Sequence, residues 1–165
     1  MSKLVPTAEM TLGPFFPREF AQDANDLAGN ASNAIEITGR VTELDGRPLD
    51  NVVLEIWQAD AAGRFDNPGF SGWGRAPTDA NGIYRFRTIK PGAAKGRAPH
   101  VNVLVLYSGL MRQLQTAMFF DASPDPVLES IPAPRRKLLI GQQTGNGYRF
   151  DIRLRGADET PFFDD

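Results

Sequence analysis

The sequence predicts an all-β fold, an antiparallel β-sandwich in one domain with a packing arm at each end. Three observations predict it. Apolar residues recur with a period of two in several short segments, turn residues separate those segments, and no stretch as long as an average helix of about 11–12 residues holds a helical period. A chain of 165 residues is long enough to bury the core of one such domain.

The first expected strand covers residues 35–41, where Ile35, Ile37, Gly39 and Val41 alternate with polar residues. Successive side chains of a strand point to opposite faces, so this alternation is typical of a strand with one buried and one solvated face.

Five later segments also read as strands because they are apolar, aromatic or β-branched: 52–58, 82–88, 101–107, 114–120 and 148–155. In Val101–Leu106 only Asn102 is polar, so that strand is expected to be covered on both faces. In 148–155 apolar and charged residues alternate strictly, which indicates a strand with one wet face.

Turn residues lie between these segments. Asp45-Gly46 and Asn81-Gly82 are typical of hairpin turns, and further breaks fall at residues 62–63 and 90–92. Only Pro126–Ser130 and Arg135–Ile140 could each form a helical turn or two.

The two ends of the chain differ from its middle. We expect residues 1–33 to form an N-terminal arm or interface segment and residues 34–165 to form the sandwich domain. Thr11–Pro17 and Thr160–Asp165 carry phenylalanines that such short segments cannot bury alone. Both are therefore expected to pack against the sandwich or a partner, with an intersubunit contact favoured.

Composition excludes several classes of function. The net charge is −2 and no Lys/Arg block stands out, so neither nucleic acid nor an anionic membrane is an expected partner. No apolar run approaches the roughly 20 residues of a membrane helix, and the N-terminus has no signal-peptide pattern. The absence of cysteine removes thiolate chemistry and fits a cytoplasmic protein.

The inventory of ligands and catalytic groups is small: one histidine, His100, and three tyrosines. A lone histidine at the start of a buried strand is most often structural. His100 and Asn102 lie two residues apart, so their side chains share one strand face about 6.6 Å apart. Two imidazoles at that spacing could grip one metal ion, but the amide of Asn102 is a poor ligand for a transition metal.

Three motifs carry a specific resemblance. Leu-Glu-Ile-Trp-Gln-Ala at residues 54–59 leads into Gly63-Arg64, a second block spans Thr78–Gly92, and Ala98-Pro99-His100 follows. In this order they resemble the motifs of the intradiol ring-cleavage dioxygenase family. The resemblance runs from about Thr11 to the last residue and implies the intradiol dioxygenase type of β-sandwich.

The resemblance also implies where a metal would bind. The family holds non-haem Fe(III) with two tyrosinates and two histidines. Three of these four positions are substituted here: Phe65 and Ala94 replace the tyrosines, Asn102 replaces the second histidine, and His100 is retained. We therefore expect neither bound metal nor a catalytic residue in this chain, because Fe(III) needs the anionic ligands.

Within the family, this pattern resembles the α chains of protocatechuate 3,4-dioxygenases, in which only the β chain carries iron. The resemblance rests on Ala98–Asn102, Tyr148–Arg153 and Glu159–Asp164. It implies a catalytic β-chain partner of the same fold that holds Fe(III), with O₂ and a catechol such as protocatechuate at a shared site. Cleavage there yields a cis,cis-muconate-type diacid, as in aromatic catabolism.

In such α chains an N-terminal segment helps to line the substrate pocket, and the matching residues here are Thr11, Gly13 and Pro14. Family α chains often have an arginine where this chain has Ser108. Arg97 matches an arginine that lies near iron in catalytic chains, and without iron it is expected to be a solvated or interface charge.

Two other functions compete with an α subunit. One is a stand-alone, metal-free β-sandwich that binds small aromatic acids without turnover. The other is an iron enzyme with a rearranged site, which the ligand inventory disfavours.

Overall fold

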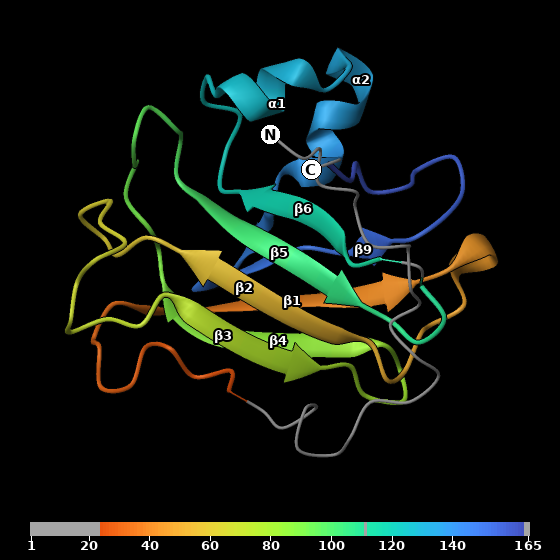
Figure 1. The fold of residues 1–165 in the computed structure, drawn as a ribbon, viewed down its shortest axis with the longest axis horizontal. Coiled ribbons are helices and arrows are strands. Elements are labelled where there is room, and N and C mark those ends of the chain that lie inside the picture. The colour runs from red at the N-terminus through yellow and green to blue at the C-terminus, as the bar shows by residue number, and fades with distance from the viewer. Residues whose placement is uncertain (1–23, 111, 164–165) are drawn as a thin grey trace, which may run out of the picture.

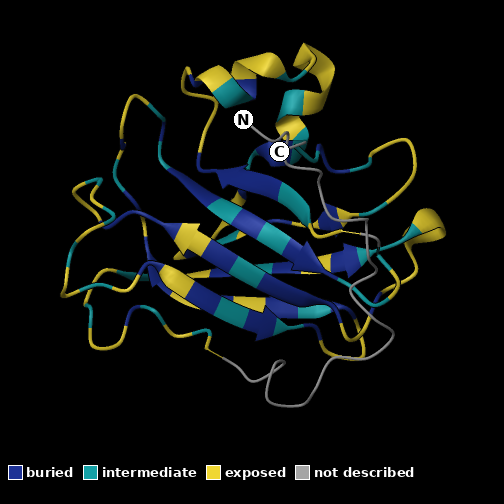
Figure 2. Cartoon of the chain, viewed as in Figure 1, coloured by how far each residue is buried: buried dark blue, intermediate teal, exposed yellow. Residues whose placement is uncertain are grey.

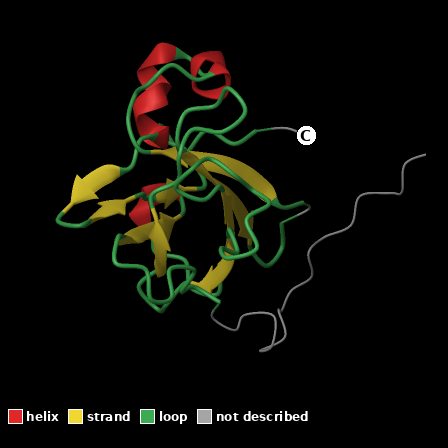
Figure 3. Ribbon diagram, turned by 90° about the vertical axis from the view of Figure 1, so that its left-hand side faces the viewer, coloured by secondary structure: helices red, strands yellow, loops and turns green. Residues whose placement is uncertain are grey.

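The computed structural model describes residues 24–110 and 112–163, which form two β-sheets packed face to face (Figures 1 and 3). The first sheet has the strand order β3-β2-β5-β6 and is antiparallel throughout. Its strands are β2 (Val53–Gln58), β3 (Trp73–Pro77), β5 (His100–Leu106) and β6 (Leu114–Phe119).

The second sheet has the order β4-β1-β8-β7, with β9 also paired to β1. Its strands are β1 (Ala34–Thr42), β4 (Ile83–Ile89), β7 (Gln142–Thr144), β8 (Gly147–Arg149) and β9 (Ile152–Arg153). β1 runs antiparallel to β4 but parallel to β8 and β9.

The expected all-β sandwich is confirmed, with two departures in detail. Strands β3 and β7 were not expected. Gly74 and Pro77 are untypical of strand interiors and obscure the strand pattern of β3, and β7 has only three residues. The single strand expected at 148–155 is wrong, because the ladder breaks between β8 and β9. There the side chain of Asp151 accepts the backbone N–H of Arg40 at 2.9 Å, in place of a backbone carbonyl.

Short helices lie beyond the β6 end of the first sheet (Figure 1). They are α1 (Pro126–Ser130), α2 (Ala133–Arg136) and a 3₁₀ turn, η2 (Lys137–Leu139); a second 3₁₀ turn, η1 (Leu44–Gly46), follows β1. The helical turns expected at 126–130 and 135–140 therefore exist, with the second beginning two residues earlier. In the described parts of the chain, no helix has the length and hydropathy needed to cross a membrane.

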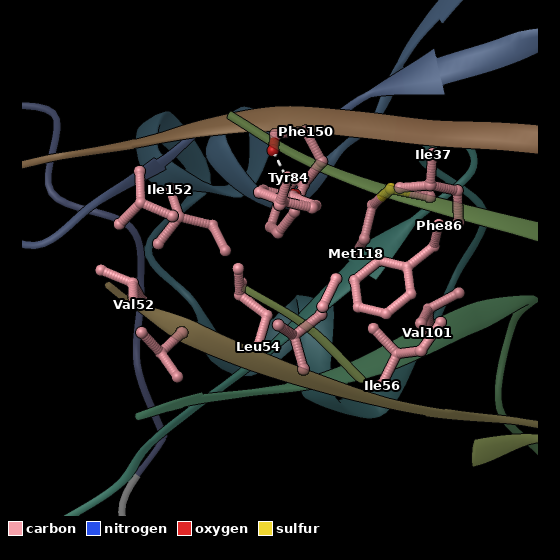
Figure 4. Packing of buried hydrophobic residues seen from close by; sticks show 14 of the residues in the cluster. Ile37, Val52, Leu54, Ile56, Tyr84, Phe86, Val101, Met118, Phe150 and Ile152 are labelled. Atoms are coloured by element: carbon pink, nitrogen blue, oxygen red, sulfur yellow. Dashed lines mark hydrogen bonds between the residues drawn. The ribbon is translucent and has the colours of Figure 1, made fainter. Parts of the chain in front are cut away.

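The main core lies between the two sheets, and the inward-facing positions of the strands are buried (Figures 2 and 4). β5 was expected to be covered on both faces, and its inward residues Val101, Val103 and Val105 are buried. Its outer face is only partly covered, because Asn102 and Leu104 are half-buried. A smaller apolar cluster beneath the helices covers that face next to β6.

Buried polar groups tie the sheets together at defined points. The Gln58 side chain at the end of β2 donates to the carbonyl of Ile89 at 2.9 Å and accepts the Thr88 hydroxyl at 2.9 Å, so it joins β2 to β4 across the interior. The Tyr84 hydroxyl donates to the carbonyl of Phe150 (Figure 4). Burial raises the pKa of Tyr84 far above its ordinary value, so this hydroxyl keeps its proton.

The described ends of the chain cover three of the four outer strand edges. Near the N-terminus, Ala24 exchanges backbone hydrogen bonds with Arg75 of β3, and Asn25 and Leu27 bond to Arg87 of β4. The segment thus spans the edges of both sheets.

The C-terminal arm packs on the chain itself. The Thr116 hydroxyl of β6 donates to the carbonyl of Pro161 at 2.8 Å, and Phe163 donates its backbone N–H to Gln115 at 2.8 Å. Phe162 packs against the main core. Residues 160–163 therefore pack against the sandwich of this chain, which is one of the two expected alternatives, and the contact with a partner stays a prediction. The division into an arm at 1–33 and a sandwich from 34 stays a prediction, since residues 1–23 lie outside the described residues.

Candidate functional site

The four family ligand positions lie on three segments that meet at one end of the first sheet. Phe65 lies in the loop after β2, Ala94 in the loop after β4, and His100 and Asn102 on β5. The two loops pack closely: the backbone N–H of Gly92 donates to the carbonyl of Asp60 at 2.9 Å. A Cβ at Gly63, where φ is +78°, would lie 2.0 Å from the carbonyl oxygen of Ala93, so the approach requires glycine.

Phe65 packs on the surface of the sheet. Its ring stacks on Trp57, with centroids 6.3 Å apart and planes 11° apart, and the Lys95 ammonium lies 5.9 Å from the ring centroid. These contacts are apolar and cation–π in kind, so the ring has a packing role that needs no phenolic oxygen.

Ala94 is buried and begins a tight turn in which it exchanges backbone hydrogen bonds with Arg97 at 2.9 and 3.2 Å. The two central residues, Lys95 and Gly96, have φ of +51° and +75°, as a type I′ turn requires. The methyl group of Ala94 offers no ligand atom at this position.

His100 is buried against Phe119, with ring centroids 5.7 Å apart. Its Nδ1 lies 2.7 Å from the carbonyl oxygen of Ala98. A carbonyl only accepts, so Nδ1 carries the proton and Nε2 keeps its lone pair. Burial lowers the pKa of His100, with a smaller opposing effect from the Ala98 hydrogen bond, so the neutral ring is favoured.

Asn102 lies opposite Trp57 on β2 and Ala117 on β6. Its side-chain amide donates to the backbone carbonyl of Trp57 at 3.2 Å. The amide is thus engaged with the neighbouring strand, and Trp57 in turn carries the Phe65 ring.

Asp60 holds the loop that carries Phe65. Its carboxylate accepts the backbone N–H groups of Ala62 and Arg64, both at 2.9 Å, and the side chains of Arg64 and Asn67 at 3.1 and 2.8 Å. The hydrogen bond from the Arg64 backbone is the largest effect on Asp60; burial opposes it, and the pKa falls to about 2. The carboxylate is therefore ionised and acts as a structural acceptor.

Arg97 was expected to be a solvated or interface charge, and it is not simply solvated, because it pairs with a carboxylate of this chain. Its Nε donates to Asp125 at 2.7 Å, and the Asp125 side chain is completely buried. Although burial alone would raise the pKa of Asp125, hydrogen bonds from Arg97 and from backbone N–H groups together lower it. The backbone of Ala98 is held by the same carboxylate at 2.9 Å, so this pair fixes the chain just before His100.

Between residues 24 and 163, leaving out residue 111, no group of three or more His, Asp or Glu side chains lies close enough to hold a metal ion. His100 is the one family ligand type left at the four positions, and a single neutral imidazole does not fit Fe(III). The residues present therefore do not suit the family's metal. The arrangement can pack, stack and hydrogen-bond, but it offers no activated nucleophile.

Thr11, Gly13 and Pro14, the expected pocket-lining residues, lie outside the described residues. Ser108, which stands where family α chains often have arginine, is half-buried just after β5.

Sequence reasoning missed two structural features of this end of the sheet. Trp57 and Trp73 lie opposite each other on β2 and β3 and are 45% and 37% exposed. The alternation of 52–58 could have placed Trp57 on the outer face, but Trp73 lies in a strand that was not expected. Asp125 gave no signal, because its partner Arg97 is 28 residues away.

Comparison with known proteins gives consistent matches. The family model described as Dioxygenase matches residues 13–99. The protocatechuate 3,4-dioxygenase alpha chain of Burkholderia cepacia is 34% identical over 196 aligned residues, covering 99% of this chain and all of that one. The beta chain from the same organism is 35% identical over 198 aligned residues, covering 96% of this chain and 84% of that one.

A solved structure agrees with the sequence matches. The dioxygenase domain of a dioxygenase carbohydrate-binding protein fusion from Streptomyces sp. SirexAA-E has a TM-score of 0.65 and 28% identity, covering 93% of this chain and all of that one.

Proposed function

The chain belongs to the intradiol ring-cleavage dioxygenase family, and from that premise we propose that it is the non-catalytic α subunit of a protocatechuate 3,4-dioxygenase-like enzyme. In this proposal a β chain of the same fold holds Fe(III), and this chain supplies scaffold and part of the substrate pocket. The assembly cleaves a catechol between its hydroxyl groups and works in the cytoplasm, which the absence of cysteine fits.

One observation carries the proposal: the substituted ligand positions have other structural roles. Phe65 stacks on Trp57, and the amide of Asn102 donates to the Trp57 carbonyl. The Ala94 position is a buried methyl in a tight turn. The loops and the strand that carry the family's ligand positions are present in this chain, but three of the four ligand side chains are replaced. This is expected of a subunit whose partner performs the chemistry.

Overall identity does not decide between α and β, since the two Burkholderia cepacia chains are 34% and 35% identical to this one. The match covers all of the α chain and 84% of the β chain. The ligand positions favour α, because Fe(III) at a β-type site needs tyrosinate ligands that Phe65 and Ala94 cannot supply.

The pocket contribution that we propose comes from Thr11, Gly13 and Pro14. A stiff Gly-Pro backbone beside a partner's site would orient an aromatic diol and exclude water without acting as an acid or base. The iron of the partner chain would supply the activation of catechol and O₂.

We further propose that the partner covers the exposed pair Trp57 and Trp73. In the described residues the exposed large apolar side chains are these two tryptophans and Leu44. Both tryptophans lie on the face that carries Asn102, so they adjoin the altered ligand positions. Exposed aromatic residues in such a patch are typical of protein interfaces.

The test is co-expression with a β-type homologue, followed by iron analysis and oxygen uptake on protocatechuate. The expected result is an αβ complex with about one iron per αβ pair, activity in the complex and neither iron nor activity in this chain alone. Trp57→Ala should weaken assembly and leave folding of the lone chain intact, because its side chain is exposed. Leu44→Ala, an exposed apolar residue in the 3₁₀ turn after β1, is the matched control.

Two outcomes would contradict the proposal. Stoichiometric iron in this chain alone, with the visible tyrosinate-to-iron absorption of the family, would show a rearranged iron site. If the purified chain is folded, forms no complex with any β homologue and binds small aromatic acids, it is a stand-alone binding module.

A further inference from the structure

A hollow of about 150 Å³ lies on the outer face of the five-stranded sheet, far from the altered ligand positions in the fold. This sheet lies behind the β3-β2-β5-β6 sheet in Figure 1, so its outer face is turned away from the viewer. Six residues line the hollow, and three of them are arginines: Thr38, Gly39, Arg40, Ile83, Arg85 and Arg149.

Strand register explains why three arginines meet there. Thr38 of β1 lies opposite Arg85 on β4 and beside Arg149 on β8, so the two guanidinium groups flank one short side chain. Arg40 follows Thr38 by two residues and therefore projects from the same face. The small threonine and the following Gly39 leave the space that the three long side chains surround.

The three arginines around the hollow differ in how strongly a carboxylate pairs with each of them. Arg149 is held tightly by Asp151, with an N–O distance of 2.8 Å. Arg85 lies 3.4 Å from Glu36, and both side chains are more than half exposed, at 61% and 52%, so this pair is weak. Among the described residues, no carboxylate lies within ion-pair distance of the Arg40 guanidinium.

We propose that this hollow binds a small dianionic oxyanion, a phosphate or a short dicarboxylate. Arg40 offers a free guanidinium fork, Arg85 can turn from Glu36 to the ligand, and Arg149 is fixed by Asp151 with donors to spare. Guanidinium groups bind carboxylate and phosphate oxygens with paired hydrogen bonds. The Thr38 hydroxyl at the floor adds a neutral donor.

Size and surrounding charge set the ligand class. At about 150 Å³ the hollow is smaller than the roughly 300–1,000 Å³ typical of pockets for larger ligands, which suits a phosphate or a chain of a few carbons. Glu36 and Asp151 flank the hollow and the whole chain carries a net charge of −2, so an extended polyanion such as nucleic acid would be repelled. The site does not depend on the ring-cleavage role proposed above.

The test is isothermal titration calorimetry of the full chain with inorganic phosphate and, separately, with succinate. Chloride at equal ionic strength is the reference. The wild-type chain should bind at least one of the two dianions with saturation, and chloride should give no saturable heat. Arg40→Ala should weaken that binding about tenfold or more, since it removes a guanidinium group that can make paired, charge-assisted hydrogen bonds.

Two further variants sharpen the test. Glu36→Gln should strengthen binding about 2–5-fold, because it frees Arg85 from a weak surface pair. Arg87→Ala is the matched control and should bind as the wild type does: Arg87 also projects from the outer face of β4, but it lies outside the hollow and is held by Asp26 at 2.9 Å.

The relative affinities of phosphate and succinate decide which dianion the site favours. The proposal fails if both dianions behave like chloride. It also fails if Arg40→Ala binds as tightly as the Arg87→Ala control. Thermal melting of each variant confirms that the comparison is made on folded protein.

Discussion

Asp125→Asn is expected to destabilise the chain severely although the two side chains have nearly the same shape. One carboxylate oxygen accepts the backbone N–H groups of Val127 and Leu128 at 2.8 and 3.2 Å. The other accepts Arg97 Nε at 2.7 Å and Ala98 N at 2.9 Å. All four partners are donors, and the side chain is completely buried.

Asparagine replaces one of these acceptors with an NH₂ donor. Whichever way the amide turns, two donors lose their acceptor and face another donor, and in both orientations the Arg97 charge loses its anionic partner. Breaking a buried ion pair by changing one partner costs about 3–5 kcal/mol. Because small domains are stable by about 5–15 kcal/mol, this is a large part of the free energy of unfolding.

Urea unfolding followed by far-UV circular dichroism measures the loss, and hydrogen exchange at Val127 and Leu128 locates it. Asp158→Asn is the control: its pair with Arg153 is at 3.1 Å and its side chain is 62% exposed, so the expected loss is below about 0.5 kcal/mol. A loss below about 1 kcal/mol for Asp125→Asn would refute the four-donor account.

Three other changes test the fold around the site. Tyr84→Phe leaves the Phe150 carbonyl without its buried donor and should cost about 1–3 kcal/mol in urea unfolding; an unchanged midpoint would contradict that hydrogen bond. The pKa of Asp60 falls from 3.8 to about 2 on folding, so its stabilising effect is present above pH 4 and is lost as the pH falls towards 2. The melting temperature of Asp60→Asn should therefore depend less on pH between pH 4 and 2 than that of the wild type. An equal dependence would contradict the stabilising role of the ionised Asp60 carboxylate. Gly63→Ala places a Cβ 2.0 Å from a carbonyl oxygen and should lower the free energy of unfolding by about 2 kcal/mol or more. At Gly145, φ is +58° and the space is open, so Gly145→Ala should cost only about 1 kcal/mol. Equal losses of stability in thermal melting would show that backbone strain, and not the clash, acts at both positions.

The sequence allowed much of the fold to be predicted because side-chain alternation survives wherever one strand face is buried. Ile35, Ile37 and Val41 therefore located β1 to within a residue. β3 could not be predicted because its buried residues are Gly74 and Ala76, whose small side chains add little to a pattern of apolar alternation. The break after β8 could not be predicted for a different reason: alternation continues through it, and the ladder is interrupted by hydrogen bonds of two side chains, Asp151 to the backbone of Arg40 and Tyr84 to the carbonyl of Phe150.

The altered ligand positions could be named from local motifs, since Phe65 and Asn102 each lie beside residues that resemble the family's. What those side chains do instead could not be predicted. The contact of Phe65 with Trp57 depends on a loop closing back on its own strand, and the Asn102 bond depends on the β2–β5 register. Both are set by tertiary structure rather than by spacing along the chain.

The covered sheet edges bear on how the folded chain avoids pairing with other chains. Ala24 pairs with the edge of β3, Leu27 with that of β4, and Phe163 with that of β6, leaving the three-residue β7 as the one open edge in the described part of the chain. Once folded, the chain therefore offers few strand edges as a backbone template for strand-to-strand aggregation. Recognition of the β chain proposed above would then depend on side chains, which can distinguish that chain from a second copy of this one even though the two share a fold.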